Sequence, residues 1–185
     1  MQYVISVMSS DHPGIVAGVG SAVERLGGNI VSCSQTVLGG YFTFITIVDI
    51  PKQFTPNELA EIVRRSEGLG DDYQVMARCY DPKAKAASPG KDAESFVITA
   101  FGKDRPGIVR EFSRYLAGHD INITDLFGDQ RDEDFVLIGQ LTIPLGVNIG
   151  SLRDDLEETG RELGFTVKLQ HNNIFVATNQ LRLAE

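Results

Sequence analysis

The sequence predicts an α+β protein in which one βαββαβ unit of antiparallel strands occurs twice, with the helices on one face of each sheet. The hexapeptide Asp11–Val16 returns as Asp104–Val109, at an offset of 93 residues. The same offset aligns further pairs, such as Asn29 with Asn122, over about fifty residues without a gap. In each copy the apolar residues alternate between strand-like and helix-like spacing in the order β-α-β-β-α-β. One structural unit is therefore written twice.

This repeat divides the 185-residue chain into four parts. The first copy is expected at residues 1–80 and the second at residues 94–171. Residues 81–93 are rich in Ala, Pro, Ser and Gly and have no periodic apolar residues, which is typical of a linker. Residues 172–185 have no counterpart in the first copy. Their apolar residues are compatible with a short helix that extends the second unit.

In the first copy, runs of β-branched residues and the glycines between them predict four strands and two helices. Pro13 stands at the first position of a helix, where its missing N–H costs nothing, and Gly27 with Gly28 can end that helix. Gly39 and Gly40 join two strands in a hairpin. Thr55 and Pro56 open the second helix. The strands are expected at residues 2–8, 29–38, 41–50 and 72–80.

The second copy repeats this order. Ile108, Phe112 and Leu116 mark one face of its first helix, and Leu152 with Leu156 marks its second. The strands are expected at residues 96–101, 121–130, 135–143 and 165–170. Both third strands are apolar on both faces, which predicts that the second sheet face is also covered, by the sister copy or by another chain such as that of a homodimer. The alternative is a central strand with some exposed apolar surface.

Charge and composition exclude several classes of function. A net charge of −8 and a pI near 4.9 argue against direct nucleic-acid binding, which needs clustered Lys and Arg. No apolar run approaches a membrane span, and the amino terminus reads as a strand and not as a signal peptide. Cys33 and Cys79 are far apart and outside any metal-ligand spacing with the histidines. We therefore expect a cytoplasmic protein without metal, cofactor or membrane contact.

The two repeated loops are the candidate ligand sites. Each ends at a helix amino terminus, where free N–H groups and the helix dipole favour an anion. Gly14 and Gly107 would let a carboxylate approach the backbone, and Asp11 and Asp104 offer a carboxylate to an ammonium group. Asn29 and Asn122, at the start of the next strand, are expected near the same edge of the unit. An α-amino acid would suit such a mixed set.

The same residues also allow a purely structural interpretation, in which Asp, Pro and Gly build a helix-entry turn and Asn caps a strand. The spacing by itself leaves both interpretations open. Neither Ser nor Cys stands in a nucleophile motif, and the glycines around Gly18 lie inside a helix instead of between a strand and a helix. Nothing in the sequence indicates catalysis.

The Asp-x-Pro-Gly-Ile-Val loop, its helix and the Asn-Ile start of the next strand resemble ACT domains, which are small ferredoxin-like modules that bind amino acids and regulate other functions. The resemblance covers nearly the whole chain. Two such units without an enzyme domain are similar to tandem ACT regulators such as the glycine cleavage system transcriptional repressors. In this family, ligands lie at interfaces between ACT units, against the first loop and the start of the second strand. The resemblance therefore implies ligand-binding roles for Asp11, His12, Gly14, Asn29, Asp104, Arg105, Gly107 and Asn122.

The first copy departs from the family in having His12 where Arg is frequent, and the second lacks the glycine pair before its asparagine. Arg105 is always charged, whereas His12 is mostly neutral at pH 7, so the second loop is expected to be the tighter site for a carboxylate. The resemblance implies a non-enzymatic regulator that senses an amino acid and acts through a regulated protein partner, with transcription as the candidate target. The alternative is a protein–protein interaction module without a small ligand.

Overall fold

The computed structural model describes residues 1–66, 72–83 and 92–176. It divides into two compact units, Met1–Ala84 and Lys85–Glu185. Each unit holds a four-stranded antiparallel sheet and two helices, so the predicted fold class, two tandem ferredoxin-like βαββαβ units, is confirmed. The predicted linker at 81–93 falls largely outside the described residues. Of the carboxyl-terminal extension, residues 172–176 are helical and residues 177–185 lie outside the described part.

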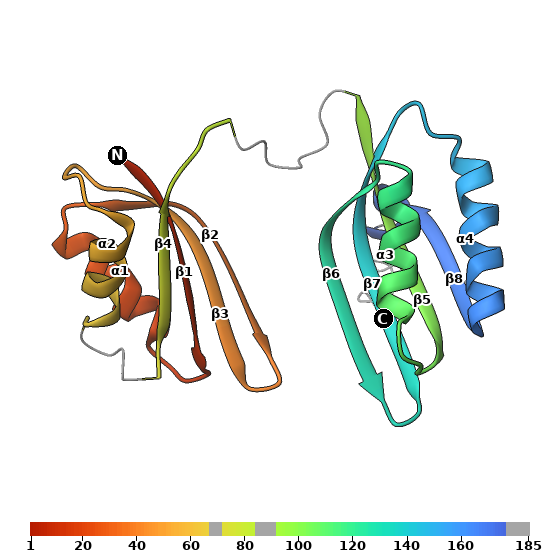
Figure 1. Cartoon of the computed structure of the whole chain (residues 1–185), viewed down its shortest axis with the longest axis horizontal. Coiled ribbons are helices and arrows are strands. Elements are labelled where there is room, and N and C mark those ends of the chain that lie inside the picture. Colours follow the sequence, from red (N-terminus) through yellow and green to blue (C-terminus); the bar gives the residue numbers. More distant parts are fainter. Residues whose placement is uncertain (67–71, 84–91, 177–185) are drawn as a thin grey trace. The chain divides into compact units, whose positions relative to one another are not determined.

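The first unit has the strand order β2-β3-β1-β4, and both of its helices lie on one face of the sheet (Figure 1). Alternation in β1 sends Tyr3, Ile5 and Val7 to that face, where they pack against Val19 and Leu59 of the helices. The elements are β1 (Gln2–Ser10), α1 (Ile15–Arg25), β2 (Asn29–Leu38), β3 (Tyr41–Asp49), α2 (Pro56–Arg64) and β4 (Gln74–Cys79).

The second unit repeats this order as β6-β7-β5-β8. Its core joins Phe96 and Ile98 of the sheet to Phe112 and Leu156 of the two helices. The register between neighbouring strands matches the first unit, with a bulge after Ile123 as there is after Ile30. The elements are β5 (Ala93–Lys103), α3 (Ile108–Gly118), β6 (Asn122–Arg131), β7 (Asp134–Pro144), α4 (Ile149–Leu163) and β8 (Phe165–His171).

Local chemistry explains where the helices begin. Thr55 caps α2 in a capping box with Glu58, and Asn148 caps α4 through Ser151 N–H. In contrast, α1 and α3 begin at Gly14 and Gly107, whose φ angles of 102° and 92° lie in the left-handed region that favours glycine. Neither of these two helices has a side-chain cap. Their first N–H groups therefore remain available to a ligand.

The sheet faces opposite the helices carry exposed apolar side chains in both units. In the first unit Ile45 is 51% exposed and Met76 is 72% exposed on this face. In the second unit Val97 is buried on the corresponding face, while Phe101 is 52% exposed. Cover of these faces by another surface stays a prediction.

Tyr115 links the two helices of the second unit, because its hydroxyl donates to Asp155 on α4 over 2.9 Å. Burial, together with this hydrogen bond, raises the pKa of Tyr115 to about 12. The raised pKa means that the folded state favours the protonated phenol. This preference contributes its full stability below the unfolded-state pKa of about 10, and the contribution is lost as the pH rises through about 12.

Replacing Tyr115 by Phe is therefore expected to lower the free energy of unfolding of the second unit by about 1 kcal/mol at pH 7. Urea denaturation of both proteins measures the difference, which should shrink between pH 10 and pH 12. An effect that is absent at pH 7, or that persists unchanged at pH 12, would contradict the proposed role of the hydrogen bond.

Candidate functional site

In the first unit the loop between β1 and α1 is held against the hairpin turn. The N–H of Asp11 donates to the carbonyl of Gly40 over 2.9 Å, and Asp11 itself is exposed. A side chain added at Gly14 would meet nothing within 4 Å, so the space in front of the α1 amino terminus is open. Gly39 and Gly40 both have positive φ, as the tight turn between β2 and β3 requires.

His12 is engaged within its own unit. Its Nδ1 lies 2.9 Å from the Pro13 carbonyl, and its Nε2 bonds to the hydroxyl of Tyr73. The two rings also meet edge to face, with centroids 5.7 Å apart. A neutral imidazole satisfies both contacts, with Nδ1–H donating and Nε2 accepting. Both ring nitrogens therefore already have partners before any ligand arrives.

The residues around Tyr73 fasten the same loop to β4. Tyr73 is 4% exposed, and burial raises the pKa of its hydroxyl. The hydroxyl and N–H of Ser10 donate to the Asp72 carboxylate over 2.7 and 3.0 Å and hold its pKa below the usual range. Sequence reasoning missed Tyr73. The repeat alignment contains the signal, because the corresponding residue is Phe165, which lacks the hydroxyl.

The equivalent loop of the second unit is built differently. The N–H of Asp104 donates to the Glu133 carbonyl over 2.8 Å, which repeats the contact of Asp11 with the hairpin turn. Lys103 pairs with Glu133 at 2.9 Å, and this hydrogen bond raises the pKa of the ammonium group. Arg105 is exposed, and its Nη1 reaches the Leu163 carbonyl at the end of α4 only over 3.4 Å. Its guanidinium therefore keeps most of its donors for other partners.

A pocket of about 300 Å³ opens beside this loop. It lies between the amino terminus of α3 and the carboxyl-terminal half of α4. Its lining includes two arginines, Arg105 and Arg110, and two glutamates, Glu111 and Glu162. Arg110 pairs with Glu111 at 3.0 Å. Sequence reasoning missed the α4 side of the pocket, because α4 carried no motif. The lining residues are Arg105, Pro106, Gly107, Ile108, Arg110, Glu111, Thr159, Glu162 and Leu163.

Gly102 has a packing role in the structure. A Cβ at this position would lie 2.5 Å from the Gly164 carbonyl and 2.8 Å from the Phe165 ring. The first unit accommodates Ser9 at the equivalent position, where the hydroxyl bonds to the Ser10 carbonyl. A side chain at Gly102 would therefore collide with both the Gly164 carbonyl and the Phe165 ring.

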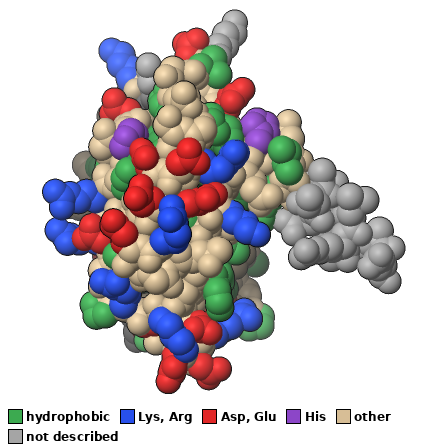
Figure 2. Space-filling view, turned by 90° about the vertical axis from the view of Figure 1, so that its right-hand side faces the viewer, with side chains coloured by type: hydrophobic (Ala, Val, Ile, Leu, Met, Phe, Trp, Pro, Cys, Tyr) green, Lys and Arg blue, Asp and Glu red, His purple; other side chains and the backbone are tan. Residues whose placement is uncertain are grey.

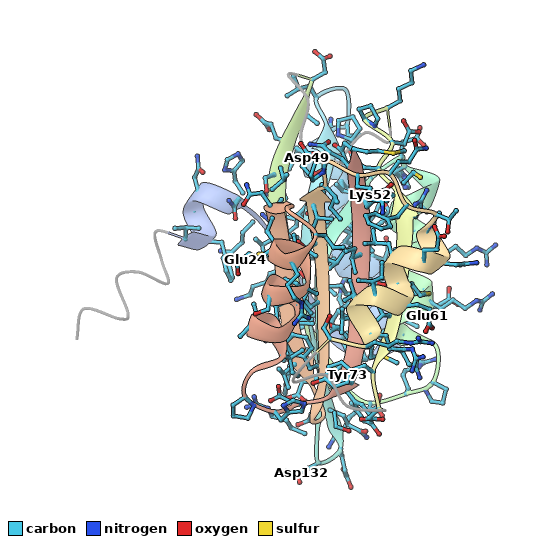
Figure 3. The ribbon with its side chains drawn as sticks, turned by 90° about the vertical axis from the view of Figure 1, so that its left-hand side faces the viewer. Glu24, Asp49, Lys52, Glu61, Tyr73 and Asp132 are labelled. Carbon is cyan, nitrogen blue, oxygen red and sulfur yellow. The ribbon has the colours of Figure 1, made fainter. Side chains whose placement is uncertain are left out.

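The expectation that each asparagine shares one edge with its loop is wrong. Asn29 is paired with Asp49 at the end where β1 begins, whereas the loop follows the end of β1. Figure 3 shows Tyr73, the partner of the loop, at one end of the first sheet and Asp49 at the other. The nine-residue β1 separates these ends by about 25 Å. The cause is α1, which runs back along the sheet before β2 starts.

The second unit has the same separation. Asn122 is paired with Thr142 near one end of β7, and the loop follows Lys103, which is paired with Asp134 at the other end. In the second unit the structure therefore brings together Asp104, Arg105 and Gly107. In the first unit it brings together Asp11, His12 and Gly14. It leaves each asparagine away from its loop. Ligand binding by any of these residues stays a prediction.

The described residues give little support to a metal site, a membrane-spanning helix or a basic nucleic-acid-binding surface. Among them, no cluster of three His, Cys, Asp or Glu side chains could hold a metal ion. His119 bonds to the Tyr115 carbonyl, and His171 stacks edge to face on Phe96. In the part of the chain that is described, no helix combines the length and hydrophobicity of a membrane span. Figure 2 shows Lys and Arg interspersed with Asp and Glu on the face in view, without a continuous basic stripe.

Each unit has a ferredoxin-like fold and an equivalent loop before its first helix. These features place the protein in a class of small modular domains. A family model described as "ACT domain" matches residues 2–78 and again residues 94–170. The chain belongs to the ACT-domain family. This membership supports a regulatory, ligand-sensing role.

Similar proteins include single units as well as whole tandem chains. A UPF0237 protein of Methanopyrus kandleri is 35% identical over 86 residues, which cover 46% of this chain and 96% of that protein. A UPF0237 protein of Listeria monocytogenes is 43% identical over 75 residues, which cover 40% of this chain and 82% of that protein. Each of these relatives therefore matches less than half of the chain over most of its own length.

Two solved structures share the tandem fold. A protein of unknown function from Galdieria sulphuraria has a TM-score of 0.73 and 22% identity, covering 92% of this chain and 97% of its own. A candidate glycine cleavage system transcriptional repressor has a TM-score of 0.62 and 18% identity, covering 92% and 98%. At these identities the likeness concerns the fold alone.

Proposed function

We propose that this protein is a non-enzymatic regulator that senses an α-amino acid at the Asp104–Gly107 loop. The observation that carries the proposal is the pocket of about 300 Å³ at this loop, where a helix amino terminus and guanidinium groups lie beside carboxylates. An α-amino acid carries one carboxylate and one ammonium group. A site with both signs of charge at short range complements that pattern.

Each part of the pocket has a role toward such a ligand. The uncapped N–H groups at the start of α3 and the Arg105 guanidinium attract the ligand carboxylate. The Glu162 carboxylate offers an acceptor to the ammonium group from the α4 side. Ile108 and Leu163 supply apolar surface for the ligand side chain. Because Gly107 has no Cβ and nothing crowds it, the carboxylate has room to reach the backbone.

The first loop is proposed as the weaker site. His12 would have to give up Tyr73 or the Pro13 carbonyl before it could bind a carboxylate, and a neutral imidazole attracts an anion less than a guanidinium does. Exchanging an existing hydrogen bond for a ligand contact yields little net free energy. The hydrogen bonds of His12 are thus better suited to holding the loop in place.

We propose that binding of the amino acid changes how this protein interacts with a protein partner. A ligand can shift a conformational equilibrium only as far as it binds one state more tightly than the other. The pocket joins α3 to α4, so a ligand there would favour the state in which these helices are held together. The net charge of −8 argues that any effect on transcription would pass through this partner and not through direct DNA binding.

A thermal-shift titration with the twenty common amino acids tests the proposal. At one hundred times Kd, a ligand stabilises the native state by about 2.7 kcal/mol, which raises the Tm of a unit of this size by roughly 10–20 °C. The amide of the most effective amino acid, which lacks the carboxylate, is the control and should give no shift. If no amino acid at millimolar concentration moves the Tm, the ligand-free interaction module becomes the better description.

A further inference from the structure

The pocket at the Asp104–Gly107 loop is lined by four charged side chains, two of which neutralise each other. Nη1 of Arg110 donates to the Glu111 carboxylate over 3.0 Å. The other two are Arg105 and Glu162. In the described part of the chain, neither of them takes part in an ion pair. The pocket therefore offers one unpaired positive charge and one unpaired negative charge.

Two helix ends of opposite polarity line the pocket. The start of α3 contributes Gly107 and Ile108, and the last turn of α4 contributes Glu162 and Leu163. A helix dipole is positive at the amino terminus and negative at the carboxyl terminus. Arg105 precedes α3 and Glu162 belongs to α4, so these side-chain charges have the same polarity as the helix ends. The carboxylate and the ammonium group of an amino acid would together occupy both unpaired charges.

The Arg110–Glu111 ion pair is not required by the fold. The first unit has Ala17 and Gly18 at the equivalent positions, at the same offset of 93 residues. The two side chains of the pair are 72% and 41% exposed, and an ion pair of this kind contributes little to stability. Either residue can therefore be replaced without unfolding the second unit, and the charge that loses its partner would lie in the pocket wall.

The rest of the lining is uncharged. Ile108 and Leu163 supply apolar surface, and Thr159 supplies a hydroxyl group. A charged ligand side chain placed here would lose water, and the opposite charge that remains in the lining is already paired. A side-chain carboxylate would have to displace Glu111 from Arg110, and a side-chain ammonium group would have to displace Arg110 from Glu111. An uncharged side chain meets neither cost.

We propose that the pocket selects amino acids whose side chains are uncharged, and that the Arg110–Glu111 pair determines this specificity. The inference rests on the proposed function, because it concerns the same site and names the class of ligand that the site takes. Glu111 withholds Arg110 from an acidic side chain, and Arg110 withholds Glu111 from a basic one. Removing one partner should therefore change which ligand is preferred, in a direction set by the charge that remains.

Calorimetric titration of the full chain with the common amino acids tests the inference. The wild type should bind the best of the uncharged amino acids at least about fivefold more tightly than any charged one. Glu111→Gln leaves Arg110 unpaired and should strengthen the binding of aspartate or glutamate about three- to tenfold. Arg110→Gln leaves Glu111 unpaired and should do the same for lysine. The double variant has neither charge and should keep the preference of the wild type.

Glu61→Gln is the matched control, because it removes the carboxylate from an ion pair of 2.9 Å with Arg64 on α2 of the first unit. It should leave the preference unchanged, and circular dichroism checks that each variant folds. If the wild type binds aspartate or lysine as tightly as the best uncharged amino acid, or if both single variants keep its preference, the inference is overturned while the proposed function stands. If no amino acid binds the wild type, both are overturned.

Discussion

Replacing Phe112 by alanine is expected to lower the free energy of unfolding of the second unit by about 3–5 kcal/mol. Phe112 is 1% exposed and lies at the centre of a core that α3 and α4 form with the sheet. Its ring meets Phe165 edge to face, with centroids 6.4 Å apart. Alanine would remove these contacts and leave a cavity. A loss of this size is a large part of the stability of a domain of about eighty residues.

Urea unfolding followed by amide NMR signals measures the effect for each unit separately, which is useful because the chain contains no Trp. The buried clusters each take their members from one unit, so signals of the first unit should persist where those of the second have been lost. Phe101→Ala is the matched control: this side chain is 52% exposed and should matter much less. A loss below 1 kcal/mol in Phe112→Ala would contradict the assignment of the core.

Replacing Arg105 by alanine is expected to weaken amino-acid binding about ten- to a hundredfold. A hydrogen bond between a guanidinium and a carboxylate contributes about 1.5–3 kcal/mol, and a factor of ten corresponds to about 1.4 kcal/mol. Among the described residues, Arg105 makes one long hydrogen bond, to the Leu163 carbonyl, and it lines the pocket. Its removal should therefore affect the ligand far more than the fold.

Calorimetric titration with the amino acid that gives the largest thermal shift measures this change. His12→Ala, at the equivalent position of the first loop, is the control and should leave the tighter site unaltered. Arg105→Lys should restore part of the affinity, because it keeps the charge but loses the fork of donors. Asn122→Ala gives a further test, since Asn122 lies at the opposite end of the unit. A comparable loss of affinity in folded Asn122→Ala would contradict a ligand confined to the loop.

The glycines show which structural requirements can be predicted from neighbouring residues in the sequence. The sequence predicts Pro13 at the first position of a helix, but α1 begins at Ile15, after Gly14 with its φ of 102°. Gly107 precedes α3 in the same way, with a φ of 92°. Gly102 had no such local explanation. The structure shows that a side chain there would collide with the Gly164 carbonyl and the Phe165 ring, about sixty residues further along the chain. A sequence pattern can indicate a backbone requirement, but a packing requirement depends on which residue the fold places opposite.

The sequence by itself determined the repeat, the βαββαβ order and the chemistry of the two loops, because strand and helix periodicity and the positions of Gly and Pro are local properties. Only the tertiary structure decided which residues share a site. The return of α1 along the sheet separates Asn29 from its loop. The strand order β2-β3-β1-β4 brings Tyr73 to His12 across 61 residues and places Ser6 between Ile45 and Met76. Contacts of this kind depend on long-range strand pairing, which the spacing of residues along one strand does not record.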